Sequence, residues 1–423
     1  MGDDPGPDRR VSRRRALVLA VVVLCSYAYF FEGGGWNQNT RFDLVREIVV
    51  HHTLSIDDYG DNTGDKARVA GHSFIDKAPG ASLTAVPAVA IARGFMRREG
   101  ERVDNADAID RLAYVGTIAT SAIPALVAVL AVFWLSRRIT GCSDTAAAAA
   151  AIAYGLGSPL WAYAIVFFGH ALCAGCLMIA LAAACALRSP RSPRAQVALG
   201  LVVGLAGGWA TVSEYPCLVP AVAIAIFAMV SARTVSGFRV VPLAAAIAGA
   251  AALCAAVLMG YNWMAFGHPL TISYTHFDDP VVMKSGFFDI VGPDWHVLPQ
   301  LLFGTYRGLV PLSPILLVVP LGFWFMLRDR RHRALGALSL GLVVFAVLLN
   351  MSYLKWTGGW NYGPRHMTWA LGFAYLSIAP VWDRSGRMGR VLLGGLIAAG
   401  VISAVLAVST TVQPPDHYLW PMR

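Results

Sequence analysis

The stretch LAYVGTIATSAIPALVAVLAVFWLSRRI, residues 112–139, decides the class of fold. It contains no charged residue until the paired arginines near its end. A helix of about 20 apolar residues crosses the ~30 Å hydrocarbon core of a bilayer. Arginines gather in the short loops on one side of a membrane. The stretch therefore predicts a membrane-spanning helix that ends at a basic turn.

The same pattern recurs along the whole chain. Of its 423 residues, 57% are apolar and only 14% are charged, whereas soluble domains contain about 25% charged residues. The composition predicts an all-α polytopic membrane protein, and the formal charge of +9 reflects basic loops rather than nucleic-acid binding. The eleven apolar runs that we expect to span are 15–31, 112–135, 145–158, 169–187, 195–212, 216–232, 240–260, 309–327, 334–353, 366–382 and 391–410.

One further apolar run, residues 81–96, is short and contains Pro87 and Arg93. If it does not cross, every basic connector lies on one side, which then holds 19 of the 34 Lys and Arg with a net charge of +13, against −4 on the other. If it crosses, giving twelve spans, the later basic connectors change sides. Because Lys and Arg mark the cytoplasmic side, we expect this run to lie against the outer leaflet.

This topology divides the chain. Residues 1–14 form a basic cytoplasmic tail that precedes an uncleaved signal anchor, 15–410 form the membrane domain, and 411–423 form an outer tail. Two long outer segments, 32–111 and 261–308, hold most of the polar residues. The seven cysteines lie in or beside apolar runs, which indicates no disulfide framework. We expect a multi-pass protein of a bacterial-type plasma membrane.

The first outer segment contains an amphipathic pattern. Asn39 or Thr40 is placed to cap a helix that runs to about residue 52. One face of this helix is apolar, and Asp43 and Glu47 are neighbours on the other. The pattern predicts a helix lying at the membrane interface, with a polar face that is either solvated or part of a site.

Carboxylates are dense in the loop that follows. Its sequence, DDYGDNTGDKA (57–67), begins like a calcium-binding loop but lacks the closing glutamate. We therefore expect no dedicated metal site, and a loosely held divalent cation remains an open alternative. The five acidic residues of this loop and the stretch after it are Asp57, Asp58, Asp61, Asp65 and Asp76.

Basic and aromatic residues mark the later outer loops. Arg307 lies where the chain re-enters the membrane, and Tyr362 and Arg365 lie in a glycine-rich connector. His170 lies at the outer end of a span, where it is either structural or lines a site. The aromatic residues of these loops either form an interfacial belt or stack on sugar rings. An arginine at the membrane surface can contact a lipid phosphate.

Several short motifs, in this order, resemble the GT-C glycosyltransferases that use lipid-linked sugars, such as the bacterial aminoarabinose transferases and the protein O-mannosyltransferases. The resemblance is weak in each motif and covers most of the chain in order and topology. The motifs are NTRF (39–42), DKAPG (76–80), SRRIT (136–140), FGHPLTISY (266–274), YRGLVPLSP (306–314) and NYGPRHM (361–367).

The resemblance implies an enzyme that moves a sugar from a polyprenyl phosphate to an acceptor on the extracytoplasmic side. An outer carboxylate deprotonates the acceptor hydroxyl, the anomeric carbon inverts, and cations neutralise the departing lipid phosphate. In the family the catalytic aspartate stands just before the Thr-Arg pair, where this chain has Gln38 and Asn39. Either another acid takes the role, such as Asp43, Asp57 or Asp76, or the chemistry differs.

The family's lysine beside proline matches Lys77, which the resemblance places near the lipid phosphate. The partners that we expect are a polyprenyl-phosphate-linked sugar, membrane lipids and an acceptor of unknown class, with no nucleic acid. No cofactor is certain from the sequence, and a divalent cation remains an open alternative. The other residues that we expect to bind substrate are Asn37, Gln38, Arg41, His72, His170, Arg307, Tyr362 and Arg365.

Two other functions remain open. A transporter of lipids or sugar-linked lipids needs ionisable residues and broken helices near the bilayer midplane, but the predicted spans here are almost free of charge. A non-catalytic relative is the other alternative, because no aspartate stands before the Thr-Arg pair.

Overall fold

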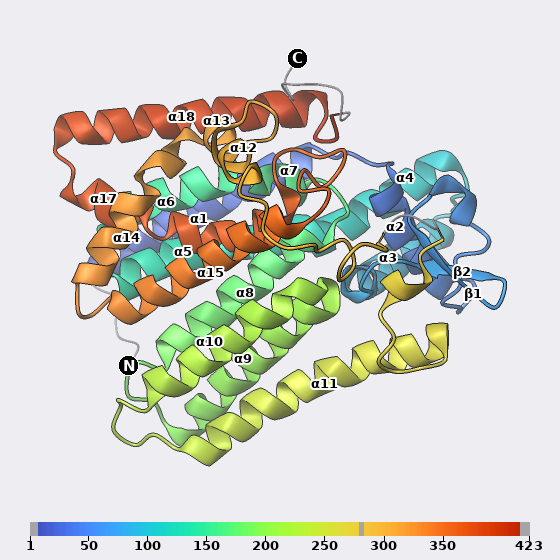
Figure 1. Cartoon of the computed structure of the whole chain (residues 1–423), viewed down its shortest axis with the longest axis horizontal. Coiled ribbons are helices and arrows are strands. Elements are labelled where there is room, and N and C mark those ends of the chain that lie inside the picture. The colour runs from blue at the N-terminus through green and yellow to red at the C-terminus, as the bar shows by residue number, and fades with distance from the viewer. Residues whose placement is uncertain (1–6, 279–282, 415–423) are drawn as a thin grey trace.

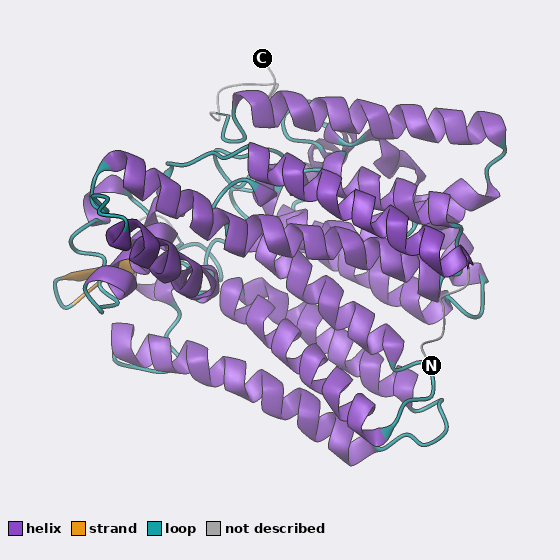
Figure 2. Cartoon of the chain, turned by 180° about the vertical axis from the view of Figure 1, so that it is seen from behind, coloured by secondary structure: helices purple, strands orange, loops and turns teal. Residues whose placement is uncertain are grey.

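The computed structural model describes residues 7–278 and 283–414 and is almost entirely helical (Figures 1 and 2). Long helices run side by side, and the first outer segment forms a compact cap at one end of them (Figure 1). Parts of the expected basic tail and outer tail, residues 1–6 and 415–423, lie outside the described residues.

Seven helices in the described chain are long and apolar enough to cross a membrane. Two of them are built from consecutive pieces: α4 (Ala106–Thr117), η2 (Ile118–Ala122), α5 (Ile123–Trp134) and η3 (Leu135–Ile139) form the first, and η4 (Tyr215–Cys217) and α10 (Leu218–Ala232) form the fourth. The others are α8 (Gly169–Ala186), α9 (Pro193–Ser213), α11 (Val240–Phe266), α15 (Arg333–Ser352) and α18 (Arg387–Thr410).

The other four expected spans also coincide with helices, which are shorter or interrupted. The first is α1 (Pro7–Tyr29) and the second is α6 (Asp144–Leu156). Proline divides the remaining two, because it removes a backbone donor and ends a helix on its N-terminal side. These two consist of α13 (Leu309–Leu312), η6 (Pro314–Val318) and α14 (Val319–Arg328), and of η7 (Arg365–Met367), α16 (Thr368–Tyr375) and α17 (Ile378–Arg384).

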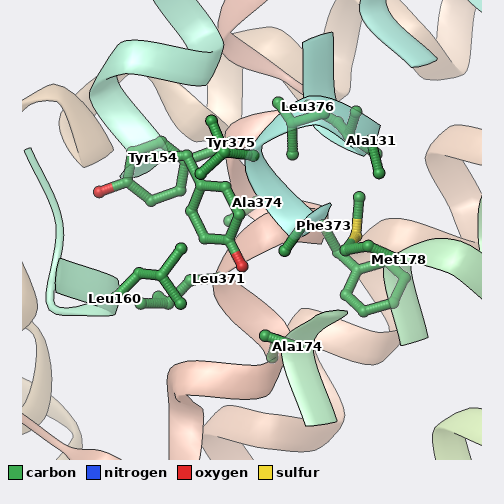
Figure 3. Close-up of a cluster of buried hydrophobic side chains, with 14 of the residues drawn as sticks. Ala131, Tyr154, Leu160, Ala174, Met178, Leu371, Phe373, Ala374, Tyr375 and Leu376 are labelled. Carbon is green, nitrogen blue, oxygen red and sulfur yellow. The ribbon is translucent and has the colours of Figure 1, made fainter. Parts of the chain in front are cut away.

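Helix α8 is the centre of the bundle and packs against α5, α9, α10 and α16. Small residues allow the close approach: a Cβ on Gly175 would lie 2.6 Å from the carbonyl oxygen of Pro124. Where α6, α8 and α16 meet, the rings of Tyr154 and Tyr375 pack beside Met178 (Figure 3). This tightly packed core holds α8 in place, and His170 lies at its N-terminal end.

The cap begins with α2 (Trp36–Val50), which starts earlier than predicted and ends slightly sooner. Neither Asn39 nor Thr40 caps it. Instead, Gly35, with a φ of 81°, turns the chain into the helix, and its carbonyl accepts a hydrogen bond from the backbone N–H of Asn39. Glycine adopts this left-handed conformation at little cost, so it sets the start of the helix without a side-chain cap.

Of the two alternatives left open for the polar face of α2, the structure excludes the solvated one. Asp43 and Glu47 are each only 1% exposed, because the loop over residues 53–65 folds back on that face. Within this loop, Asn62 of η1 (Gly60–Asn62) donates a hydrogen bond to Asp43. The helix is therefore enclosed by protein on both faces.

A short hairpin then leads into the site. Strands β1 (Lys66–Val69) and β2 (His72–Ile75) pair antiparallel through a two-residue turn in which both residues have positive φ, the usual geometry of a tight hairpin. The second outer segment pairs with its edge, since Ala67 forms a bridge with Phe277. The hairpin thus joins the two outer segments, and Asp76 and Lys77 follow directly after β2.

Helix α3 (Gly80–Arg98) contains the doubtful run 81–96 and is not among the seven candidate spans of the described chain. It packs on α2 and α4, and Arg93 is buried while its last turn ends on two exposed arginines. That this helix does not cross the membrane stays a prediction.

The remaining described elements are short: α7 (Leu160–Ala164), η5 (Ser273–His276) and α12 (Val297–Phe303). All seven cysteines are free, as the sequence indicated.

Candidate active site at the outer end of the bundle

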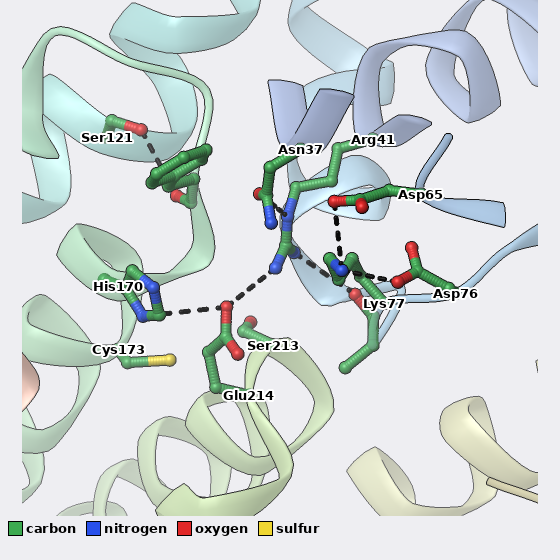
Figure 4. Close-up of polar contacts among 12 residues, drawn as sticks. Asn37, Arg41, Asp65, Asp76, Lys77, Ser121, His170, Cys173, Ser213 and Glu214 are labelled. Atoms are coloured by element: carbon green, nitrogen blue, oxygen red, sulfur yellow. Dashed lines mark hydrogen bonds and ion pairs between the residues drawn. The ribbon is translucent and has the colours of Figure 1, made fainter. Parts of the chain in front are cut away.

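Four parts of the chain meet where the cap contacts the bundle (Figure 4). Arg41 comes from α2, and Lys77 comes from the turn after β2. His170 is the second residue of α8. Glu214 is the single residue between α9 and η4, and its backbone is extended. The tertiary fold therefore gathers charges that are more than 170 residues apart in sequence.

Lys77 forms the first ion-pair group. Its ammonium lies 3.1 Å from the carboxylate of Asp65 and also bonds that of Asp76. Asp76 is fully buried, and its backbone carbonyl accepts a hydrogen bond of 2.6 Å from Ser273. Burial raises the pKa of the Asp76 carboxyl, and the charge of Lys77 opposes this. Burial lowers the pKa of Lys77, but the two carboxylates outweigh that effect and raise it overall, so the lysine stays charged.

Arg41 forms the second group and is only 2% exposed. Its guanidinium donates to Glu214 at 2.7 Å, to the side-chain oxygen of Asn37 at 3.1 Å and to the carbonyl of Ala78 at 3.4 Å (Figure 4). Since Ala78 follows Lys77 directly, Arg41 connects the two groups. The planar guanidinium can serve three acceptors at once, which an ammonium at the same place would do less well.

Glu214 extends the network toward the bundle. Its carboxylate lies 3.8 Å from Nδ1 of His170. The His170 ring meets that of His366 edge-on, with centroids 6.0 Å apart, and His366 stacks on Tyr353 at 4.4 Å. These contacts form an aromatic wall beside the charged groups, and a sugar ring can pack against such a surface.

Arg365 lies near the same groups, because its charge acts on Lys77 and on His366. Its Nε is buried and has no hydrogen-bond partner in the described chain. Arg41, Lys77 and Arg365 thus place three cations around the network, and an anionic group such as a phosphate would give the Nε of Arg365 an acceptor.

Arg307 and Tyr362 have other partners within residues 7–278 and 283–414. The Arg307 guanidinium donates to the side-chain oxygen of Asn361 at 3.2 Å and to the carbonyl of Pro414 at 3.0 Å. The Tyr362 hydroxyl pairs with Ser403 of α18 at 2.8 Å. Both side chains are fully buried, and the contacts among described residues tie them to the C-terminal part of the bundle.

Asp57 and His72 pair with each other, at 2.7 Å, on the exposed side of the hairpin. Burial acts to raise the pKa of Asp57, but hydrogen bonds from Ser55, His72 and the backbone of Ser73 outweigh it, so the pKa is lowered. Within the described chain no contact joins this pair to Lys77 or Arg41. The Asp57–His72 pair holds the loop over residues 53–65 to strand β2, and we call this pair the loop brace.

Asp43 and Gln38 are both buried in α2. Burial raises the pKa of Asp43 to about 7, against the hydrogen bond from Asn62 and the charge of Arg46. One oxygen of Asp43 and both amide atoms of Gln38 have no hydrogen-bond partner among the described residues. Asp43 is therefore a second buried carboxylate, separated from the ion pairs of Lys77.

Glu214 was missed by the sequence analysis, which named no residue between the expected spans 195–212 and 216–232. The available signal was that Glu214 is the one acidic residue in a long part of the chain, from 145 to 277, that contains no other. A carboxylate kept at the end of two apolar helices needs a partner, and the partner is Arg41.

Comparison with solved structures identifies the fold. ArnT from Cupriavidus metallidurans bound to undecaprenyl phosphate matches with a TM-score of 0.58 at 16% identity, over 93% of this chain and 64% of that chain. Its apo state matches with a TM-score of 0.55. The archaeal oligosaccharyltransferase AglB from Archaeoglobus fulgidus, in complex with an inhibitory peptide and a dolichol-phosphate, matches at 0.54 and 12% identity, over 95% and 56%. This chain has the GT-C fold.

No family model and no curated protein sequence matches the chain. The assignment of the GT-C fold therefore rests on the structural comparison alone. The chain spans about three fifths of the length of the ArnT and AglB chains that it resembles.

The buried Asp43 makes stability depend on pH. Its pKa is raised from 3.8 to about 7, so the folded chain retains a proton that the unfolded chain releases, and the stability that this proton contributes is lost as the pH rises through about 7. Wild-type protein should lose thermal stability between pH 6 and pH 8, and Asp43→Asn, which cannot ionise, should lose less.

Thermal unfolding in detergent, followed by the loss of monodisperse protein, measures this effect. The exposed Asp61 provides the control, and Asp61→Asn should keep the wild-type pH dependence. Equal pH dependence in wild type and Asp43→Asn would contradict the assigned pKa.

Proposed function

We propose that this protein transfers a sugar from a polyprenyl-phosphate donor to an acceptor on the extracytoplasmic face of a bacterial-type plasma membrane. The observation that carries the proposal is the joined pair of ion-pair groups, Arg41–Glu214 and Lys77–Asp76, at one end of a bundle with the GT-C fold. ArnT, which has the same fold, is a transferase that was solved with undecaprenyl phosphate.

The arrangement of charge supports chemistry at the membrane surface. The donor's lipid stays in the bilayer while its phosphate and sugar project to the surface, so the reaction needs cations and a base at that depth. Lys77 and Arg365 would neutralise the phosphate as it leaves, in a buried site where charges act strongly. A transporter would need such groups near the middle of the spans.

The proposed step is a single displacement at the anomeric carbon. The acceptor oxygen forms a bond to that carbon, and the bond from the carbon to the phosphate oxygen breaks with its electron pair going to the phosphate. Asp76 takes the acceptor's proton. It lies beside the phosphate-binding lysine, one of its oxygens is unpartnered among the described residues, and burial brings its pKa closer to neutral.

Arg41 and Glu214 are proposed to position this site rather than to react. Arg41 bonds the carbonyl of Ala78 and so holds the turn that contains Asp76 and Lys77.

Activity of purified protein in lipid vesicles tests the assignment, with release of undecaprenyl phosphate from undecaprenyl-phosphate hexoses and pentoses as the readout. Asp76→Asn should lower turnover at least about a hundredfold, the loss expected when a general base is removed, with little change in binding of undecaprenyl phosphate. Lys77→Met should weaken that binding at least about tenfold, since a charge-assisted contact to phosphate is lost. Asp57→Asn, on the loop brace, should stay near wild type.

Full activity in Asp76→Asn, with loss in Asp43→Asn instead, would move the base to α2. Absence of release from every donor, together with lack of undecaprenyl phosphate binding, would contradict the proposed function.

Orientation is tested by labelling introduced cysteines with a membrane-impermeant maleimide in intact cells. Glu99, at the end of α3, is exposed, and its backbone suits any residue. Glu99→Cys should label from outside, and Arg191→Cys, in the basic connector between α8 and α9, should label only after permeabilisation. The reverse result would overturn the proposed orientation.

A further inference from the structure

Three side chains with metal-ligating atoms meet at the C-terminal end of α2. Glu47 and His51 are four residues apart and share one face of the helix, and Asp58 comes from the loop that folds back on it. His51 Nδ1 lies 2.9 Å from a Glu47 oxygen and 3.0 Å from an Asp58 oxygen. The three ligand atoms lie within 4.8 Å of one another.

These three groups contain fewer hydrogen-bond donors than their acceptors require. Nδ1 of a histidine holds at most one proton, yet two carboxylates approach this same nitrogen. The Glu47 carboxylate is only 2% exposed, and in the described chain it has no Lys or Arg within ion-pair distance. Its other contact is the backbone N–H of Asp58, at 3.3 Å. Burial of a carboxylate without a full countercharge is costly.

The neighbouring arginine does not supply that charge. The Arg46 guanidinium lies over the ring of Tyr59, at 3.5 Å, and its ion pair, at 3.8 Å, is with Asp43. The His51 ring also stacks on the Tyr59 ring, and the two ring centroids are 6.0 Å apart. The site is thus held in place by packing while its two carboxylates share one nitrogen.

We propose that Glu47, His51 and Asp58 bind a divalent transition-metal cation of the Zn²⁺ class. One imidazole nitrogen and two carboxylate oxygens form a ligand set that suits such ions better than Ca²⁺ or Mg²⁺, which prefer oxygen alone. Bond lengths of about 2.0–2.2 Å place ligand atoms at separations close to those in the cluster. His51 and Asp58 are 39% and 64% exposed, which leaves a route for the ion and a position for water.

The ion would fasten the loop over residues 53–65 to α2. Further along this loop, Asn62 donates to Asp43, and Asp65 pairs with Lys77. A cation at its start would therefore support both contacts without touching the reacting groups. The binding itself does not depend on the proposed function.

Calorimetric titration of Zn²⁺ into EDTA-treated protein in detergent tests the proposal. Wild type should bind about one Zn²⁺ with a Kd below about 10 μM, and Co²⁺ at the same site should give a d–d absorption band. Glu47→Gln and His51→Gln should each weaken binding at least about tenfold, as loss of a ligand does. His72, which pairs with one carboxylate only, supplies the control, and His72→Gln should bind as wild type does.

The variants are first shown to be monodisperse, and Zn²⁺ should raise the thermal stability of wild type but not of His51→Gln. A wild-type Kd weaker than about 100 μM, or equal weakening in His72→Gln, would overturn the proposal. Unchanged binding in Glu47→Gln would do so as well.

Discussion

The ion pair between Arg41 and Glu214 is the interaction on which the rest of the site depends. Its atoms lie 2.7 Å apart, and the two side chains are 2% and 14% exposed. A charge at this depth is costly unless it is paired and hydrogen-bonded. Each residue therefore requires the other, and this requirement holds the first outer segment against α9 and α8.

The ion pair between Arg41 and Glu214 also fixes the position of the turn after β2. Arg41 contacts Ala78, so the turn after β2 is placed over the outer end of the bundle, and Asp76 and Lys77 are buried with it. The spans beneath are packed closely through small residues, which leaves a rigid end on which polar groups can be positioned. The cap therefore holds the buried charged groups, while the helices of the bundle beneath contain few charges.

The sequence was sufficient to predict an all-helical bundle with helices at the eleven apolar runs, because hydropathy is a local signal. That the run 81–96 does not cross, and that Asp76 and Lys77 lie beside the membrane, stay predictions. The sequence did not predict that Asp43 and Glu47 are buried, since the loop that covers them follows no periodic pattern. It also missed Glu214, because the role of this residue depends on its ion pair with Arg41, which is 173 residues away in sequence. Partners that only tertiary folding brings together leave no local pattern in one sequence.

A double-mutant cycle on Arg41 and Glu214 measures this dependence most directly. Thermal and denaturant unfolding of Arg41→Gln, Glu214→Gln and the double variant should show that each single change is strongly destabilising and that the double change costs less than their sum, by at least about 1 kcal/mol. Glu214→Asp, which keeps the charge, should be milder than Glu214→Gln. Additive losses within about 0.3 kcal/mol would contradict the claim that this pair holds the cap to the bundle.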